Sequence, residues 1–360
     1  MSEVLAAALS ASGGVDRATH GFHTYPAGLH PDAAAILVGA FGGDVLDPFC
    51  GGGTVLVEAR CAGRRAVGRD VSPVALLVSQ ARCCTAGDEE LTLLRSVARR
   101  ATEVARRATE PPPDPIARAV AEWYAPHAAI ELESLRRSVA EAPSGVRPLL
   151  RCCLSSILVK VSWRRSDTSG RRVKHRRPPG TTAVLFHKKA RELARRIVAL
   201  RGLVPAGTPE ADLQLVDVRQ LRLDTPVDLV ITSPPYPSTY DYLPLQHLRR
   251  IWLELPDGRG EIGARRAWRQ GERRARRAWR DDTFAWTARA AGCLREGGHL
   301  IVVIGDGVTP AGAVDTSEPT EEAARAAGLT LLGRASVERA DHAREGARWE
   351  HTFAFRKERG

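Results

Sequence analysis

Short apolar runs alternate along the chain with longer segments in which apolar residues recur at helical spacing. The runs that predict strands lie at 45–46, 64–70, 213–217, 227–231 and 299–304. Helical segments separate most of them, and this alternation predicts an α/β fold built on a doubly wound, Rossmann-like sheet. Two later runs, 329–332 and 351–355, are expected to close the sheet, the second of them as an antiparallel edge strand.

The stretch between the second and third of these strands carries helical periodicity and no strand signal. Helices are predicted at 91–108, 117–142 and 148–161, followed by a basic loop and one more helix. We therefore predict a helical region inserted into the sheet domain. The predicted divisions are an N-terminal tail at 1–19, made of a frayed helix and a glycine-rich linker, a first part of the sheet domain at 20–110, the helical, arginine-rich insertion at 111–202, and a second part of the sheet domain at 203–360.

A formal net charge of +11 favours a polyanionic partner, with nucleic acid ahead of a membrane surface. An arginine-rich proteome would raise this charge without any partner, so the position of the arginines matters more than their number. Two segments are basic, 162–179 with Trp163, and 259–280 with Trp268 and Trp279. Their composition suits phosphate contacts and base stacking, although the first also fits a solvated or disordered basic tract. The candidate nucleic-acid contacts are Arg164, Arg165, Arg171, Arg172, Lys174, Arg176, Arg177, Arg265, Arg266 and Arg269.

The seven cysteines form no C-x-x-C pair and their number is odd, which favours neither a disulfide framework nor a zinc ribbon. We expect small buried residues in a reducing compartment. The N-terminus is acidic rather than basic at its start, and no apolar run reaches membrane-spanning length. A cytoplasmic protein with no membrane partner and no metal site is therefore expected.

The stretch that organises the chemistry is Thr232-Ser-Pro-Pro-Tyr236, directly after the apolar run 227–231. Two prolines lock the backbone and remove two N–H donors, so the strand stops and the neighbouring carbonyls can point into a cleft. Acceptors beside a flat aromatic ring suit a planar ligand with an exocyclic amino group, which describes a nucleobase. The alternative is a strand-end turn with an ordinary surface tyrosine.

A second organising stretch, 43–54, runs from a strand through three glycines into a helix. This unit opens a doubly wound sheet, and its helix N-terminus favours a carboxylate or a phosphate. A P-loop would need a Gly-Lys-Ser/Thr ending, which is missing, and a dinucleotide fingerprint would want Gly or Ala where Leu56 stands. An S-adenosylmethionine site needs only the turn and a nearby carboxylate. The alternative is a tight turn with no ligand.

Two acids end predicted strands on the same side of the sheet. Asp70 follows the second strand, where it can hold both hydroxyls of a ribose, although it can also begin the next helix. Asp217 follows the third strand and can accept a hydrogen bond from an adenine amino group. The loop 20–31 carries three histidines that fit no zinc spacing, so we expect it to face a ligand. The segment 240–243 is expected to continue the wall of the site.

Together these residues resemble the S-adenosylmethionine-dependent amino-group DNA methyltransferases of the cytosine-N4 and adenine-N6 type. The resemblance rests on Asp47-Pro-Phe-Cys-Gly-Gly-Gly-Thr54, on Thr232-Ser-Pro-Pro-Tyr236 and on the order of the acids between them. It covers about residues 20–90 and 210–307 and leaves the helical insertion unmatched. The pairing of the two motifs is specific, whereas each motif alone is not.

The resemblance implies a role for each matched residue. In that family the first motif cradles the methionine part of S-adenosylmethionine, and the catalytic motif varies among Asp, Asn and Ser at its first residue. The Ser form is similar to that of enzymes acting on the cytosine amino group. The implied catalytic residues are Ser233, Pro234, Pro235 and Tyr236. The implied cofactor contacts are Tyr25, Pro26 and His30 from the loop, Asp47, Pro48, Phe49, Gly51, Gly53 and Thr54 from the first motif, and Asp70 and Asp217.

The chemistry also follows from the residue types. A base amino nitrogen is a poor nucleophile because its lone pair is delocalised into the ring. If Ser233 and the Pro234 carbonyl accept its hydrogens, they favour a pyramidal nitrogen whose lone pair faces a sulfonium methyl group, and transfer needs positioning and no covalent intermediate. Ring-carbon methylation would call for a Pro-Cys pair, which the sequence lacks. Tyr236 would stack on a flipped base.

The favoured function is thus methylation of duplex DNA at a flipped base, cytosine ahead of adenine. Double-stranded DNA is the expected partner and RNA the alternative, and no feature assigns a nuclease partner. An RNA base-amino methyltransferase and a catalytically inactive nucleic-acid-binding protein of the same fold remain alternatives. A small-molecule methyltransferase would leave the two basic segments without a role.

Overall fold

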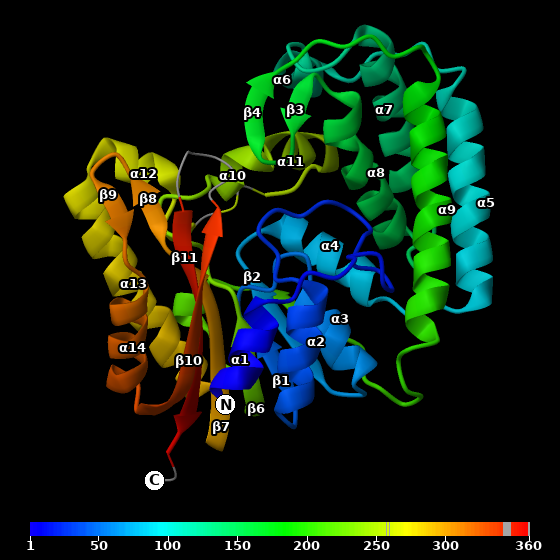
Figure 1. Ribbon diagram of the computed structural model, residues 1–360. Helices are drawn as coiled ribbons and strands as arrows, with labels where there is room; N and C mark the ends of the chain where they lie inside the picture. Colours follow the sequence, from blue (N-terminus) through cyan, green and yellow to red (C-terminus); the bar gives the residue numbers. More distant parts are fainter. Residues whose placement is uncertain (257, 259, 341–346, 359–360) are drawn as a thin grey trace.

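Seven strands form the central sheet in the order β10-β11-β7-β6-β1-β2-β5, in a computed structural model that describes residues 1–256, 258, 260–340 and 347–358 (Figure 1). The strands are β1 (Val45–Asp47), β2 (Ala66–Asp70), β5 (Asp212–Leu215), β6 (Val227–Thr232), β7 (Leu294–Gly305), β10 (Leu329–Ala340) and β11 (Ala347–Lys357). Neighbouring strands are parallel except that β11 is antiparallel to both β7 and β10. The predicted doubly wound α/β sheet is confirmed.

The prediction that 351–355 forms the edge of the sheet is wrong. Strand β11 pairs with β7 on one side and β10 on the other, so β10 is the edge strand. The apolar side chains of Phe353 and Phe355 explain this placement, because both are fully buried between the sheet and the helices on one of its faces.

Both faces of the sheet are covered by helices. Successive residues of β1 point to opposite faces, with Val45 in one apolar core and Leu46 in the other. The first face carries α1 (Ser2–Leu9), α2 (Pro31–Ala40) and α3 (Thr54–Cys61). The second face carries the 3-10 helix η1 (Val218–Gln220), α13 (Glu272–Gly292) and α14 (Ser317–Ala326).

The helix predicted at the N-terminus is present, but it packs on the sheet and is not frayed. Helix α1 lies beside β10 and β11 in Figure 1, and its side chains Leu5, Ala8 and Leu9 are buried. A Cβ added at Gly333 of β10 would lie 3.1 Å from Met1 Cγ, so this glycine lets the helix approach the strand closely. Apolar residues at helical spacing make the segment part of the fold.

The inserted helical region is confirmed, and it begins after α4 (Pro73–Cys83). Its helices are α5 (Asp88–Ala105), α6 (Asp114–Val120), α7 (Pro126–Ala140), α8 (Arg147–Val161) and α9 (Thr181–Arg201). The single helix predicted at 117–142 is divided, because Pro126 occupies the first turn of α7, where proline is tolerated and starts a helix. The region has its own apolar core, with Leu150 and Phe186 fully buried.

After β6 the chain passes through α10 (Tyr242–Leu245), α11 (His247–Leu253) and α12 (Arg265–Gln270). Trp252 of α11 is fully buried in the core of the helical region, so this segment joins that region to the sheet. Two hairpins were not predicted: β3 (Arg164–Ser166) with β4 (Ser169–Arg172), and β8 (Gly307–Thr309) with β9 (Gly312–Val314). Among the described residues, no helix is both long and apolar enough to cross a bilayer.

Candidate functional site

A cavity lies where the loops that follow β1, β2, β5 and β6 converge. Parallel strands bring their carboxyl ends to one edge of a sheet, which is where ligands bind in folds of this type. Of the residues singled out from the sequence, those that line this cavity are Tyr25, Pro26, Asp47, Pro48, Phe49, Gly51, Thr54, Asp70, Asp217, Ser233 and Pro235. The glycine turn and the double-proline bend therefore open onto one cavity.

Four of the singled-out residues lie elsewhere. Tyr236 and His30 line a second, adjoining cavity, and Gly53 and Pro234 line neither. His30 is the N-cap of α2, where its Nδ1 accepts a hydrogen bond from Asp32 N at 3.2 Å. Gly53 has φ of +78°, and a Cβ there would lie 3.0 Å from Ser79 Cα, so packing against α4 requires this glycine.

A hydrogen bond ties the two bends together. The Thr232 hydroxyl donates to Asp47 Oδ1 at 2.7 Å, and the Phe49 N–H donates to the same oxygen at 3.1 Å. Thr232 directly precedes Ser233, so this bond sets the distance between the double-proline stretch and the glycine turn. Burial raises the pKa of Asp47 to about 7, and the neighbouring Asp70 carboxylate acts in the same direction.

Asp70 ends β2 and lines the same cavity beside the glycine turn. Its Oδ2 accepts the Gly51 N–H at 2.9 Å, and its Oδ1 accepts the Ser72 N–H at 2.8 Å. Gly51 has φ of +48°, a left-handed conformation that aims its N–H at the acid. Burial raises the pKa of Asp70 to about 6, although the backbone hydrogen bonds oppose the shift. The carboxylate can still accept hydroxyl donors.

Asp217 lines the same cavity but is held by a partner that was not expected. Arg219 donates its Nε to Asp217 Oδ1 at 2.9 Å and its Nη2 to Oδ2 at 2.5 Å, and Arg219 is itself bridged to Asp282 at 2.8 Å. These hydrogen bonds lower the pKa of Asp217. The arginine fixes the carboxylate and leaves it ionised, with only part of its acceptor capacity for a ligand.

The N-terminal loop is anchored over the glycine turn by a buried arginine that sequence patterns did not single out. Arg82 of α4 donates to Gly52 O at 3.0 Å and to His23 O at 2.6 Å. This double contact places Tyr25 against Gly51, where an added Cβ would lie 3.2 Å from the Tyr25 ring. The loop therefore forms a fixed wall of the cavity.

The far wall comes from the segment after β6. Tyr242 lines the cavity, and its N–H donates to Glu261, whose second oxygen accepts Arg266 Nη1 at 2.6 Å. Tyr242 lies in the segment expected to continue the site wall, whereas Glu261 was not singled out. An acid within an arginine-rich run carries no signal of its own in the sequence.

The structure corrects part of the prediction that the two basic segments contact nucleic acid. Arg164 is buried, and it donates to Ser169 O at 3.0 Å and to Leu245 O at 2.6 Å, so it holds β3 against α10 and cannot reach a phosphate. Trp268 and Trp279 are also buried, because they face the core beneath α13, so neither is available for stacking.

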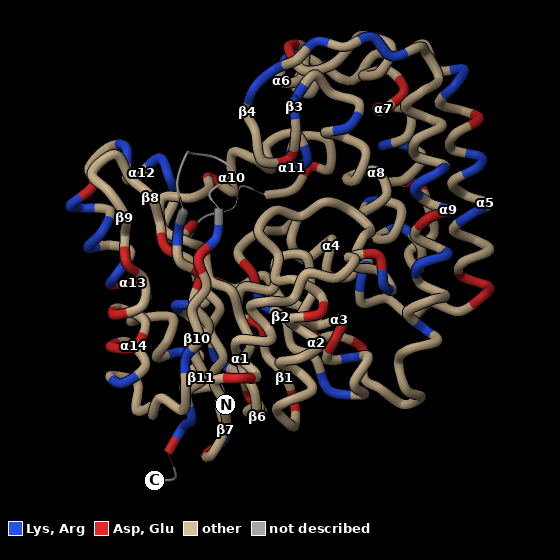
Figure 2. Tube along the Cα trace, in the orientation of Figure 1, with Lys and Arg blue, Asp and Glu red and all other residues tan. Residues whose placement is uncertain are grey.

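The remaining basic candidates lie on or near the surface. Arg165, Arg171, Arg172, Lys174, Arg176 and Arg177 are exposed on and beside the β3–β4 hairpin, where Figure 2 shows a run of basic residues. Arg266 and Arg269 are exposed on α12, with Arg265 half-buried beside them. Arg259, where the second basic segment begins, lies outside the described residues. The β3–β4 hairpin and α12 are therefore basic at the surface. None of the tryptophans of α12 and α13 is exposed for stacking beside them.

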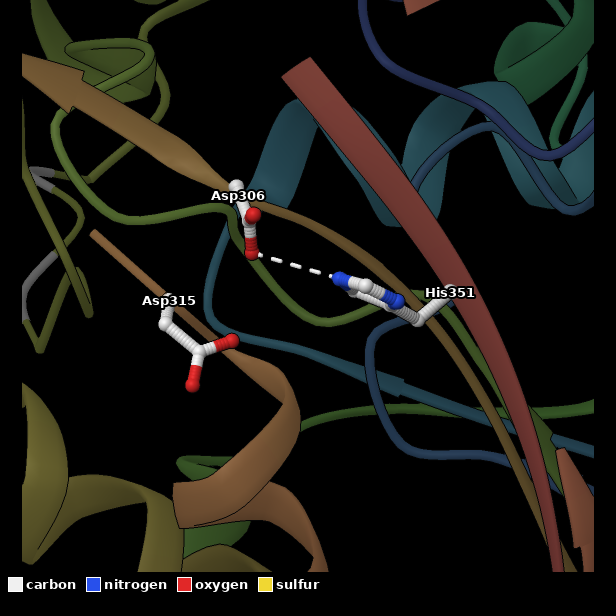
Figure 3. Close-up of side chains that lie close together, drawn as sticks. All are labelled: Asp306, Asp315 and His351. Atoms are coloured by element: carbon white, nitrogen blue, oxygen red, sulfur yellow. Dashed lines mark ion pairs between the residues drawn. The ribbon is translucent and has the colours of Figure 1, made fainter. Parts of the chain in front are cut away.

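Three side chains near the end of β7 approach one another closely enough to share a cation, as Figure 3 shows for Asp306, Asp315 and His351. Two of them have clear roles in the fold. Asp306 Oδ1 accepts the N–H and the hydroxyl of Thr316, both at 3.0 Å, and Asp315 Oδ1 accepts the Ser317 N–H at 3.0 Å. His351 Nε2 lies 3.4 Å from Asp306 Oδ1. These bonds hold the start of α14 against β7 and β11.

No family model and no curated protein matches the chain. Solved structures with a similar chain trace include an S-adenosylmethionine-dependent methyltransferase from Methanosarcina mazei. Its TM-score is 0.37 at 8% identity, and the match covers 90% of this chain and 98% of that one. TrmN from Thermus thermophilus has TM-score 0.34 and 13% identity over 91% of this chain and 48% of its own length. A protein provisionally classed as a DNA modification methylase, also from Thermus thermophilus, has TM-score 0.26 and 19% identity over 40% of this chain and 53% of its own. The chain thus spans about half the length of the last two, and similarities this low carry no argument about activity.

Proposed function

We propose that the chain is an S-adenosylmethionine-dependent methyltransferase that acts on the exocyclic amino group of a nucleobase in DNA, cytosine ahead of adenine. The observation that carries this proposal is the shared cavity, in which Ser233 and Pro235 face the glycine turn and Asp70. A donor held by the turn and an acceptor held by the double-proline bend would therefore meet.

The residues of the cavity fit this cofactor. Two carboxylates, Asp70 and Asp217, lie among apolar side chains that include Val71, Val218 and Ile262. Carboxylates accept hydrogen bonds from ribose hydroxyls and an adenine amino group, and the apolar side chains flank a flat ring. When bound, the cofactor supplies an electrophilic methyl group on sulfur.

The chain's own residues then position the acceptor. The Ser233 hydroxyl, which lines the cavity, accepts an amino hydrogen and turns the nitrogen lone pair towards the cofactor side of the cavity. One N–C bond forms as the methyl–sulfur bond breaks, and an amino proton leaves to water. No side chain needs to act as a covalent nucleophile.

The direct test is transfer of a radiolabelled methyl group from S-adenosylmethionine to DNA from a methylation-deficient bacterial strain, with RNA transcribed in vitro as the second substrate. Mass spectrometry of the hydrolysed nucleosides identifies the product. We expect N4-methylcytosine in DNA. Product only in RNA would establish the alternative substrate, and cofactor binding without transfer to either polymer would contradict the proposal.

A further inference from the structure

A second cavity adjoins the first and shares Ser233, Gly28 and Leu29 with it. Its remaining wall includes Tyr236 and Tyr240 from the double-proline segment and Arg339, Arg348 and Glu350 from the β10–β11 hairpin. One carboxylate and two guanidinium groups thus surround the ring that follows the double proline. These three charged groups are planar, and two positive charges stand against one negative charge. The mechanism proposed above gives them no role.

The Tyr236 ring is fixed on one side and at its tip. A Cβ added at Gly305 would lie 2.5 Å from Tyr236 Cε2, so the backbone of β7 lies directly behind the ring. The Tyr236 hydroxyl donates to Glu350 Oε1 at 2.8 Å, and burial raises its pKa well above the ordinary value, which keeps it a neutral donor. Only the cavity-facing side of the ring is left for a ligand.

That side is covered by Arg348. Its guanidinium carbon lies 5.6 Å from the centroid of the Tyr236 ring, a cation–π contact. Arg348 and Glu350 are two residues apart on β11 and so point to the same face of the sheet. Arg339, which pairs with Arg348 across the hairpin, donates its Nε to Glu350 Oε2 at 3.1 Å. Glu350 therefore holds the ring and the hairpin in one arrangement.

We propose that Arg348 and Tyr236 form the two plates of a clamp for the acceptor base. The base enters between the ring and the guanidinium group and replaces their mutual contact. A guanidinium plane stacks on nucleobases as an aromatic ring does, and the long arginine side chain can change rotamer to make room. Ser233, on the wall common to both cavities, then lies beside the amino group of the clamped base.

This inference rests on the proposed function, since it names the side chain that receives the proposed acceptor. It also specifies the ligand as a single flat base that is free on both faces. A base inside a duplex has no free face, so the clamp requires a flipped or unpaired nucleotide. The positive guanidinium further favours a base whose ring carries acceptor atoms.

The test compares Arg348→Ala and Arg348→Lys with Arg334→Ala, a control arginine on the same hairpin whose side chain is 62% exposed. Methyl transfer to methylation-deficient DNA gives the KM for the acceptor, and calorimetry gives the Kd for S-adenosylmethionine. We expect Arg348→Ala to raise the KM for the acceptor about tenfold, the scale of one lost stacking contact, with the cofactor Kd unchanged. Arg348→Lys keeps the charge but loses the plane, so it should resemble the alanine variant.

A second readout separates the clamp from the methyl transfer. Binding of deoxycytidine monophosphate to the protein saturated with S-adenosylhomocysteine is measured for the same variants. If the wild type binds the nucleotide, Arg348→Ala does not, and no methyl transfer is found, the clamp stands and the proposed activity falls. Equal KM values for wild type and Arg348→Ala, or full rescue by Arg348→Lys, overturn the clamp while the activity stands. If the wild type shows neither nucleotide binding nor methyl transfer, both the clamp and the proposed activity are overturned.

Discussion

Three acids at the carboxyl ends of the strands differ in their protonation because their surroundings differ. Asp217 is bridged to an arginine, and its pKa is lowered. Asp47 is buried and Asp70 is half-buried, neither has a basic partner among the described residues, and their pKa values rise to about 7 and about 6. Burial disfavours the charged form of a carboxyl group, whereas a guanidinium favours it. Of the two raised acids, Asp70 is the one placed to accept ligand hydroxyls.

The raised pKa of Asp70 predicts that cofactor affinity depends on pH. An ionised carboxylate accepts hydroxyl hydrogens better than a protonated one, so S-adenosylmethionine should bind more tightly as pH rises through about 6. We expect about tenfold weaker binding at pH 5 than at pH 8, measured by calorimetry. Asp70→Asn should bind weakly at both pH values. An unchanged affinity in Asp70→Asn would remove Asp70 from the cofactor site.

Ser233 is predicted to act on turnover and not on the cofactor. Ser233→Ala removes one acceptor for the amino hydrogens and should lower kcat by about 100-fold, the loss typical of one positioned polar group at a reacting centre. The Kd for S-adenosylmethionine should stay within about twofold, since Asp70 and the glycine turn are untouched. Ser96→Ala on α5, whose hydroxyl donates to Leu93 O, is the matched control. Lost cofactor binding with normal turnover at saturation would contradict the assignment.

At the scale of elements, the sequence predicts what depends on local pattern. The strands of the sheet and the two bends follow from apolar runs and from proline and glycine positions, and parallel strands then bring Asp70, Asp217 and Ser233 to one edge. Placement across long separations could not be predicted. Arg348 reaches Tyr236 only because β11 inserts between β7 and β10, an order that no local pattern encodes.

The tryptophans show a second limit of sequence-based prediction, because here a local pattern predicts a surface that the fold does not have. Trp268 and Trp279 stand among arginines in the sequence, which predicts a stacking surface, but their spacing along α12 and α13 turns both rings towards the core. Arg276 lies over the Trp268 ring at 5.6 Å and keeps its charge outside. A basic segment with aromatic residues can therefore be an amphipathic helix, and only the burial of each ring distinguishes the two.

Helix α1 is predicted to contribute measurably to stability. Leu5 is fully buried in the core that α1 shares with α2 and the sheet. Leu5→Ala should lower the free energy of unfolding by about 2–4 kcal/mol, because it removes apolar contact and leaves a cavity. Urea denaturation monitored by circular dichroism measures the change, and Ala7→Ser on the exposed side of the helix is the control. A free, frayed segment would give no change for either variant.

At the scale of the whole molecule, the number of arginines overstates the basic surface. Several arginines serve the interior: Arg69 is bridged to Asp212 at 2.9 Å, Arg82 anchors the N-terminal loop, and Arg249 is bridged to Asp167. Arg164 belongs to the same group. The charge available to a polyanion lies instead on exposed places such as the β3–β4 hairpin and α12.

The hairpin is predicted to set the salt dependence of DNA binding. Each phosphate contact releases a counterion, so the logarithm of the binding constant falls with the logarithm of the salt concentration in proportion to the number of contacts. The triple variant Arg171→Gln, Lys174→Gln and Arg176→Gln should reduce that slope by about 2.7, at about 0.9 for each contact. Fluorescence anisotropy of labelled duplex DNA at several salt concentrations gives the slope.

The control is a second triple variant on helix α5, with Gln in place of the exposed residues Arg95, Arg99 and Arg100. It removes the same charge from another surface. An equal loss of slope in both triples would show that net charge alone attracts DNA, and an unchanged slope in the hairpin triple would leave the hairpin off the DNA.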